Sequence, residues 1–221
     1  MAPPTTPDKR PSPEMFDEII EVKVGKAPEP VKSFYLHKGI AAFYSGYLEA
    51  AINGSFAEAK SKVIRLPEED VKTFEDFTLW LYTRNFRDIP ACQEAYDTLV
   101  DLCLFADRRD IPLLGNAAIT ALRDSFAKFW QYPTLQVKSI YQNTVSNSKL
   151  RRFIVVYLAY GCDESVLRHG TPELWPKDAL WDVLKLVWGR EHPIIWTKEK
   201  LAAVDMCTYH RHEEGEKCKK S

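Results

Sequence analysis

Residues 34–70 read FYLHKGIAAFYSGYLEAAINGSFAEAKSKVIRLPEED, and the order of the patterns within them decides the fold. An extended segment, Val31–Leu36, is followed by apolar residues at three- and four-residue steps, which is the period of a helix. Ser45 is placed to interrupt this run as a helix cap. A turn at Asn53-Gly54-Ser55 and a short apolar strand at Val63–Leu66 come next. The stretch therefore predicts a helical hairpin between two strands.

The segment before this stretch predicts another strand. Apolar and polar residues alternate in Ile19–Val24, as in a half-buried strand, and Gly25 ends it in a turn. Residues 1–15 hold five prolines and few large apolar side chains, so we expect them to form a disordered tail. Three short strands then enclose the helical hairpin. The predicted core consists of Phe34, Leu36, Phe43, Tyr47, Leu66, Phe74 and Trp80.

Helical patterns alone follow the last strand. Pro67-Glu68-Glu69-Asp70 has a proline followed by acids, which is typical of a first helical turn, so the acids are explained by the helix dipole. Gly161 and Gly189 lie where C-terminal caps belong. Further helices are predicted at 91–107, from 111 towards 130, and at about 134–144, 149–160 and 176–188.

The predicted class is α+β. A domain with a short sheet capped by helices covers residues 16–130, and an all-α region follows over residues 131–206. Residues 207–221 form a polar tail that contains candidate metal ligands.

Composition argues against nucleic-acid-binding and membrane-spanning proteins. The chain has 30 basic and 31 acidic residues, so it lacks the excess of positive charge that attracts the phosphates of nucleic acid. Its longest apolar run, residues 153–160, is far shorter than the ~20 residues that span a membrane. No secretory signal is visible at the N-terminus, so we expect a cytoplasmic or nuclear protein.

The cysteines do not predict a disulfide framework. Their number, five, is odd and they show no paired spacing, which agrees with a reducing compartment. Cys92, Cys103 and Cys162 are expected to act as small core hydrophobes.

The sequence contains none of the common signatures of nucleotide binding, hydrolysis or redox chemistry, so we predict that the protein is not an enzyme. The pair His37-Lys38 resembles an acid–base or phosphate-binding pair. A histidine that opens a helix and is satisfied by backbone groups is the interpretation we favour.

Five motifs, in this order, resemble the BTB/POZ domain, and the likeness covers roughly residues 16–110. It is strongest to BTB proteins of filamentous fungi. The motifs are Phe34-Tyr35-Leu36-His37-Lys38, Tyr44-Ser45-Gly46-Tyr47-Leu48, Asn53-Gly54-Ser55-Phe56-Ala57-Glu58, Val63-Ile64-Arg65-Leu66-Pro67-Glu68, and Phe74-Glu75-Asp76-Phe77-Thr78-Leu79-Trp80-Leu81-Tyr82-Thr83.

The resemblance implies a protein-binding scaffold or regulatory partner that self-associates or, alternatively, recruits substrates to a cullin-type ubiquitin ligase. Phe56 and Glu58 match the hydrophobic-x-acid motif that ligase adaptors place against cullin, although Phe56 could instead plug the helical hairpin. Strand-exchanged BTB dimers use an extra N-terminal helix. The proline-rich residues before Asp17 cannot form one, so this form of dimer is not expected.

One cluster near the C-terminus has ligand chemistry. Cys207, His210, His212 and Cys218 carry thiols and imidazoles, which are the side chains that zinc prefers. A structural zinc ion and a solvated, metal-free tail are both open interpretations. A zinc-dependent enzyme is a remote alternative, because it would need an open coordination position.

The C-terminal region is also rich in tryptophan. In the predicted helix 176–188, Leu180, Trp181, Leu184, Val187 and Trp188 form an apolar stripe that by default belongs to a core. If the helix leaves Trp181 or Trp188 exposed, this face becomes the expected partner site, because aromatic anchors carry much of the binding energy.

Overall fold

The computed structural model describes residues 10–54, 61–87, 93–130, 134–162, 171–189, 196–214 and 216–218. The chain divides into two compact units. The first unit comprises residues 1–88, 105–115 and 212–221, and the second comprises residues 89–104 and 116–211. None of the helices in the described ranges combines the length and the apolar character needed to span a bilayer.

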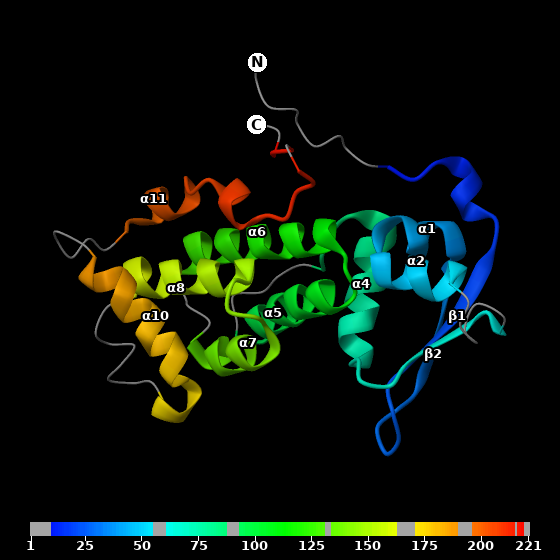
Figure 1. Ribbon diagram of the computed structural model, residues 1–221, viewed down its shortest axis with the longest axis horizontal. Coiled ribbons are helices and arrows are strands. Elements are labelled where there is room, and N and C mark those ends of the chain that lie inside the picture. The colour runs from blue at the N-terminus through cyan, green and yellow to red at the C-terminus, as the bar shows by residue number, and fades with distance from the viewer. Residues whose placement is uncertain are drawn as a thin grey trace. The chain divides into compact units, whose positions relative to one another are not determined.

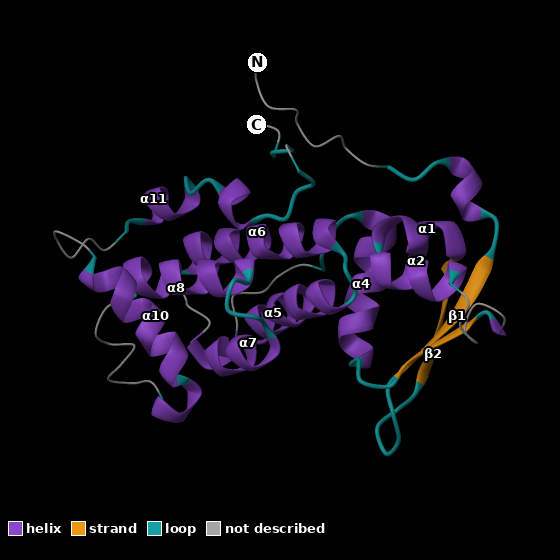
Figure 2. Ribbon diagram, in the orientation of Figure 1, coloured by secondary structure: helices purple, strands orange, loops and turns teal. Residues whose placement is uncertain are grey.

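The first unit contains a three-stranded sheet in the order β2-β1-β3 (Figure 2). Strand β1 (Ile19–Val24) pairs antiparallel with β2 (Lys32–His37) and parallel with β3 (Val63–Leu66). The predicted strands are confirmed. Alternation places Ile20, Val22 and Val24 on the buried face because successive side chains of a strand point to opposite sides.

The predicted helical hairpin is confirmed as α1 (Lys38–Tyr44) and α2 (Gly46–Asn53). Ser45 separates the two helices as predicted. Its Oγ accepts a hydrogen bond from the Leu48 N–H at 3.1 Å, which caps α2, and donates one to the Arg109 carbonyl at 2.6 Å.

A 3-10 turn, η1 (Pro13–Phe16), precedes the sheet and packs against α1. The approach is so close that a Cβ atom on Gly39 would lie 2.7 Å from the Cα of Met15. A side chain larger than that of glycine at position 39 would therefore displace the turn.

Helix α4 (Val71–Thr83) begins later than predicted. Pro67–Asp70 precede the helix, and Asp70 is its N-cap, with Oδ2 accepting from the Thr73 N–H at 2.8 Å. The expectation that these acids occupy the first turn was wrong, because they precede the helix and only Asp70 caps it.

Five of the seven predicted core residues are buried: Phe34, Leu36, Leu66, Phe74 and Trp80. The prediction was wrong for Tyr47, which is 36% exposed, and Phe43 is only half-buried. The break at Ser45 resets the helical phase, so Tyr44 and Leu48 face the core instead.

Helices α5 (Gln93–Arg108) and α6 (Pro112–Phe129) each contribute residues to both units. The second unit also contains η2 (Thr134–Gln136), α7 (Val137–Asn143), α8 (Lys149–Gly161), η3 (Pro172–Leu174), α10 (Lys177–Trp188), α11 (Lys198–Ala202) and η4 (Met206–Tyr209). The predicted α+β class with a helical C-terminal region is confirmed. The sequence did not predict α11.

Of the two predicted glycine caps, Gly189 is confirmed and Gly161 is not. Gly189 caps α10, and its N–H lies 3.3 Å from the Lys185 carbonyl. Gly161 is instead the last residue of α8, and Cys162 is the cap. Among the predicted core cysteines, Cys103 is buried and Cys162 half-buried, while Cys92 lies outside the described residues.

Candidate functional site

Within the part of the second unit that the structure describes, the main packing of helix α10 is on one side. It packs against α7 and α8 (Figure 1), and Ala179 on this side is fully buried. The Tyr141 hydroxyl of α7 donates to Asp182 Oδ2 at 3.0 Å. Burial and the neighbouring Asp182 raise the pKa of Tyr141 above its ordinary value, so the hydroxyl keeps the proton that it donates.

The opposite side of α10 is apolar and exposed. Trp188 is 73% exposed and Trp181 is 54% exposed. Three more large apolar side chains are exposed on the same side: Leu180, Leu184 and Val187. We refer to these five residues as the α10 face. The sequence analysis expected a partner site if Trp181 or Trp188 were exposed, and both are. This helix therefore presents aromatic anchors instead of burying them.

Charged residues border the α10 face. The Lys185 ammonium lies 5.8 Å from the centre of the Trp181 ring, so it marks one edge of the face. Asp178 precedes Lys185 by seven residues, which is two helical turns, so both lie along the same edge. One edge thus carries a negative charge near the start of the helix and a positive charge near its end.

The four predicted metal ligands are divided between the two units. Cys207 and His210 belong to the second unit, and His212 and Cys218 belong to the first. Cys218 Sγ is 3.4 Å from His212 Nε2. His210 is engaged elsewhere, because its Nε2 lies 2.9 Å from Thr120 Oγ1.

The model of the BTB/POZ domain matches residues 10–122, just over half of the chain. This chain belongs to the BTB/POZ family. BTB/POZ domains are protein–protein interaction modules and generally lack enzymatic activity. No curated protein matched the chain. The matched family does not distinguish fungal members from others, so the likeness to fungal proteins stays a prediction.

The predicted cullin contact cannot be placed on the BTB/POZ domain. Phe56 and Glu58 lie outside the described residues. The residues before them end α2 at Asn53, with Gly54 as its C-cap. The motif therefore follows the second helix of the hairpin in sequence, as the resemblance implies.

His37 opens a helix in the BTB/POZ domain as expected, but its imidazole contacts a side-chain hydroxyl and not a backbone group. It is the N-cap residue of α1. Its backbone N–H donates to the Tyr82 hydroxyl at 3.0 Å, and its Nδ1 lies 3.1 Å from the same oxygen. Phe16 packs edge-on against the imidazole ring. These contacts account for the histidine without an acid–base function.

Glu69 forms the most buried ion pair of the first unit among the described residues. Its side chain is 1% exposed and contacts Arg108 at 2.7 Å and Arg109 at 2.8 Å. The expectation that Glu69 serves the helix dipole was therefore wrong. The sequence contains no signal for this pairing, because about 40 residues separate the partners.

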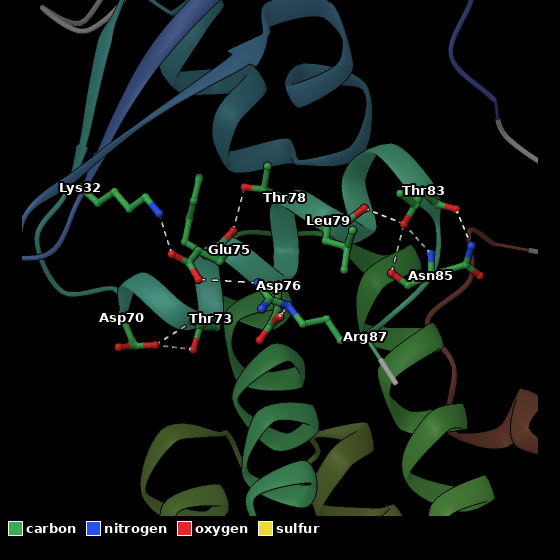
Figure 3. Close-up of polar contacts among 11 residues, drawn as sticks. Lys32, Asp70, Thr73, Glu75, Asp76, Thr78, Leu79, Thr83, Asn85 and Arg87 are labelled. Carbon is green, nitrogen blue, oxygen red and sulfur yellow. Dashed lines mark hydrogen bonds and ion pairs between the residues drawn. The ribbon is translucent and has the colours of Figure 1, made fainter. Parts of the chain in front are cut away.

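A second polar network lies along α4 and is drawn in Figure 3. Arg87 Nε contacts Asp76 Oδ1 at 2.6 Å, and Lys32 contacts Glu75 at 2.7 Å. Burial raises the pKa of Asp76 above its ordinary value, and the charge of Arg87 opposes this shift. The Lys32–Glu75 ion pair of this network joins β2 to α4, so the network supports the packing of these two elements.

Proposed function

We propose that this BTB/POZ protein is a self-associating scaffold that pairs with a second copy of itself through the α10 face. The observation that carries the proposal is the exposure of Trp181 and Trp188 on one side of a helix whose other side is anchored. Contiguous apolar surface of this kind marks interaction sites on soluble proteins. Two tryptophans supply the anchors that interfaces favour.

The charges at the edge of the face favour a second copy as the occupant. When two identical helices pack antiparallel about a two-fold axis, the same edge of each helix meets its counterpart. Asp178 of one copy then lies opposite Lys185 of the other, and the reverse pair forms as well. The formal net charge of −1 adds little repulsion between copies.

We expect the full-length protein to be a dimer and the Trp181→Ala/Trp188→Ala variant to be a monomer. Two large apolar anchors are lost from each copy, and truncation of a single interface hot spot costs about 2 kcal/mol or more. Size-exclusion chromatography with light scattering over a range of concentrations measures both states. Leu135→Ala is the control, because Leu135 is a 48% exposed apolar residue of the same unit outside α10.

Charge variants test the orientation. Lys185→Asp should weaken the dimer by placing two acids opposite each other, and the exchange Asp178→Lys/Lys185→Asp should restore it. A monomeric wild-type protein, or a tryptophan variant that dimerises as the wild type does, would contradict the proposal. A wild-type monomer would favour a different protein as the partner of the α10 face.

The alternative function is a substrate-recruiting adaptor of a cullin-based ubiquitin ligase. It is supported by the match of Phe56 and Glu58 to the adaptor motif after α2. Substrate would then bind the helical region, residues 134–206. The proposed compartment is cytoplasmic or nuclear.

We expect cullin to be captured by the wild-type protein and lost with Phe56→Ala and with Glu58→Lys if the adaptor function is correct. The first variant removes the hydrophobic anchor and the second reverses the adjacent charge. A pull-down with purified cullin measures both. The adaptor function is contradicted if the wild-type protein does not capture cullin, or if both variants capture it as well as the wild type does.

A further inference from the structure

The last segment of the second unit, residues 197–211, lies along α6 and α8 (Figure 1). It contains little regular structure, since α11 has five residues and η4 has four. Helical pieces this short are not stable by themselves in water. The segment therefore depends on the surface beneath it for its conformation, as a bound peptide does.

Side chains of α6 hold this segment mainly by its backbone. Arg123 Nη1 donates to the carbonyls of Ala202 and Val204, at 2.9 and 3.3 Å. Asn116 Oδ1 accepts from the Arg211 N–H at 2.7 Å, and Asn116 Nδ2 donates to the Arg211 carbonyl at 2.9 Å. Bonds of this kind do not depend on the side chains of the segment, so they suit the backbone of another peptide equally well.

The contacting side chains of α6 share one face of the helix. Asn116, Thr120 and Arg123 are spaced by four and three residues. Their partners in the segment come in the reverse order, so the segment runs in the opposite direction to α6. Helix α8 adds Lys149, whose Nζ donates to the Thr208 carbonyl at 2.9 Å. We refer to Asn116, Thr120, Arg123 and Lys149 as the α6–α8 surface.

Three side chains anchor the segment. Within residues 197–211, only Leu201, Met206 and Tyr209 are buried. The Tyr209 ring packs edge-on against Phe153 of α8, with 5.4 Å between the ring centroids. Proteins recognise linear segments in this way, with backbone bonds that hold the peptide and a few buried side chains that select it.

We propose that the α6–α8 surface binds a linear segment of a partner protein, and that residues 197–211 occupy this surface when the partner is absent. The seated segment defines the chemistry of the partner: a leucine, a methionine five residues later, and a tyrosine three residues after that. Residues between these anchors can vary, because the surface contacts their backbone. The proposal does not depend on the α10 face.

The start of the segment is fixed independently. Trp196 stacks on Tyr160 with ring centroids 4.6 Å apart, and its N–H donates to the Tyr160 carbonyl at 2.7 Å. Residues released from the α6–α8 surface therefore stay tethered beside it, at an effective concentration of about a millimolar. A partner has to compete with this tethered segment.

A fluorescent peptide with the sequence of residues 197–211 tests the proposal on the full-length protein. The Met206→Ala/Tyr209→Ala variant loses two anchors of its own segment, so its α6–α8 surface becomes available. We expect this variant to bind the peptide at least about tenfold more tightly than the wild type does, as measured by fluorescence anisotropy under reducing conditions. A peptide with the same two substitutions should bind at least about tenfold more weakly.

Substitutions on the surface identify the binding site. Asn116→Ala, added to the Met206→Ala/Tyr209→Ala variant, should weaken peptide binding about tenfold or more, because two bonds to the backbone are lost. Asn143→Ala is the matched control, because Asn143 is exposed and its amide donates to the Ser139 carbonyl of its own helix. The proposal is overturned if the folded variant does not bind the peptide, or if Asn116→Ala leaves binding unchanged.

The wild-type protein gives a second readout that does not require a folded variant. In protein labelled with nitrogen-15, the Arg211 amide, which donates to Asn116, reports whether the segment is seated. Unlabelled peptide at millimolar concentration should accelerate hydrogen exchange of this amide several-fold, and the peptide without the two anchors should not. Equal exchange with both peptides would refute the proposal.

Exchange of the segment between two copies of the chain is the competing occupant. The Met206→Ala/Tyr209→Ala variant would then be a monomer where the wild type is a dimer by light scattering, which would overturn the proposal of a separate partner. A variant with the oligomeric state of the wild type supports it.

Discussion

The Trp80→Ala variant is expected to lower the free energy of unfolding of the first unit by about 3–5 kcal/mol. The Trp80 side chain is fully buried. The Tyr44 ring packs edge-on against it at 5.7 Å, and the Arg84 guanidinium lies 3.6 Å from the ring centre. Substitution by alanine removes the buried area and the cation–π contact and leaves a cavity, so three losses add at one position.

Urea denaturation followed by circular dichroism measures this effect. Tyr35→Ala is the control, because Tyr35 is an aromatic residue of the same unit that is 67% exposed, and its substitution should change the free energy by less than about 0.5 kcal/mol. Equal effects in the two variants would contradict the assignment of Trp80 to the core.

The Glu69→Ala variant is expected to be destabilised by about 3 kcal/mol. This value is at the lower end of the range for a broken buried ion pair, because Arg108 remains 42% exposed to water. Arg109 is only 14% exposed and is left over the Tyr47 ring, 4.3 Å from its centre, without its carboxylate. Most of the destabilisation therefore comes from the buried charge of Arg109, which loses its partner.

The neighbouring acid offers a matched control. Glu68 is 78% exposed and its nearest ammonium, on Lys26, lies 3.8 Å away, so Glu68→Ala should cost no more than about 0.5 kcal/mol. Glu69→Gln preserves the side-chain volume and one hydrogen-bond acceptor. Its loss of unfolding free energy should therefore lie between those of Glu68→Ala and Glu69→Ala. Thermal unfolding of the three variants at one protein concentration distinguishes them, and equal midpoints for Glu68→Ala and Glu69→Ala would refute the role of Glu69.

Local patterns were sufficient to predict most elements. Strand β1 follows from the alternation in Ile19–Val24, and the break between α1 and α2 follows from Ser45, because serine is favoured at helix N-caps. The BTB/POZ domain was likewise predicted, because five short motifs in a set order are specific even where each alone is weak.

The sequence by itself therefore determined the α+β class, the family and the existence of the helix that became α10. Tertiary structure decided which faces of these elements are covered. Periodicity places Trp181 and Trp188 on one side of a helix without indicating whether a neighbour covers that side. Likewise, Glu69 meets Arg108 and Arg109 only through the path of the chain in space. Contacts between residues distant in sequence depend on packing, and no local pattern encodes them.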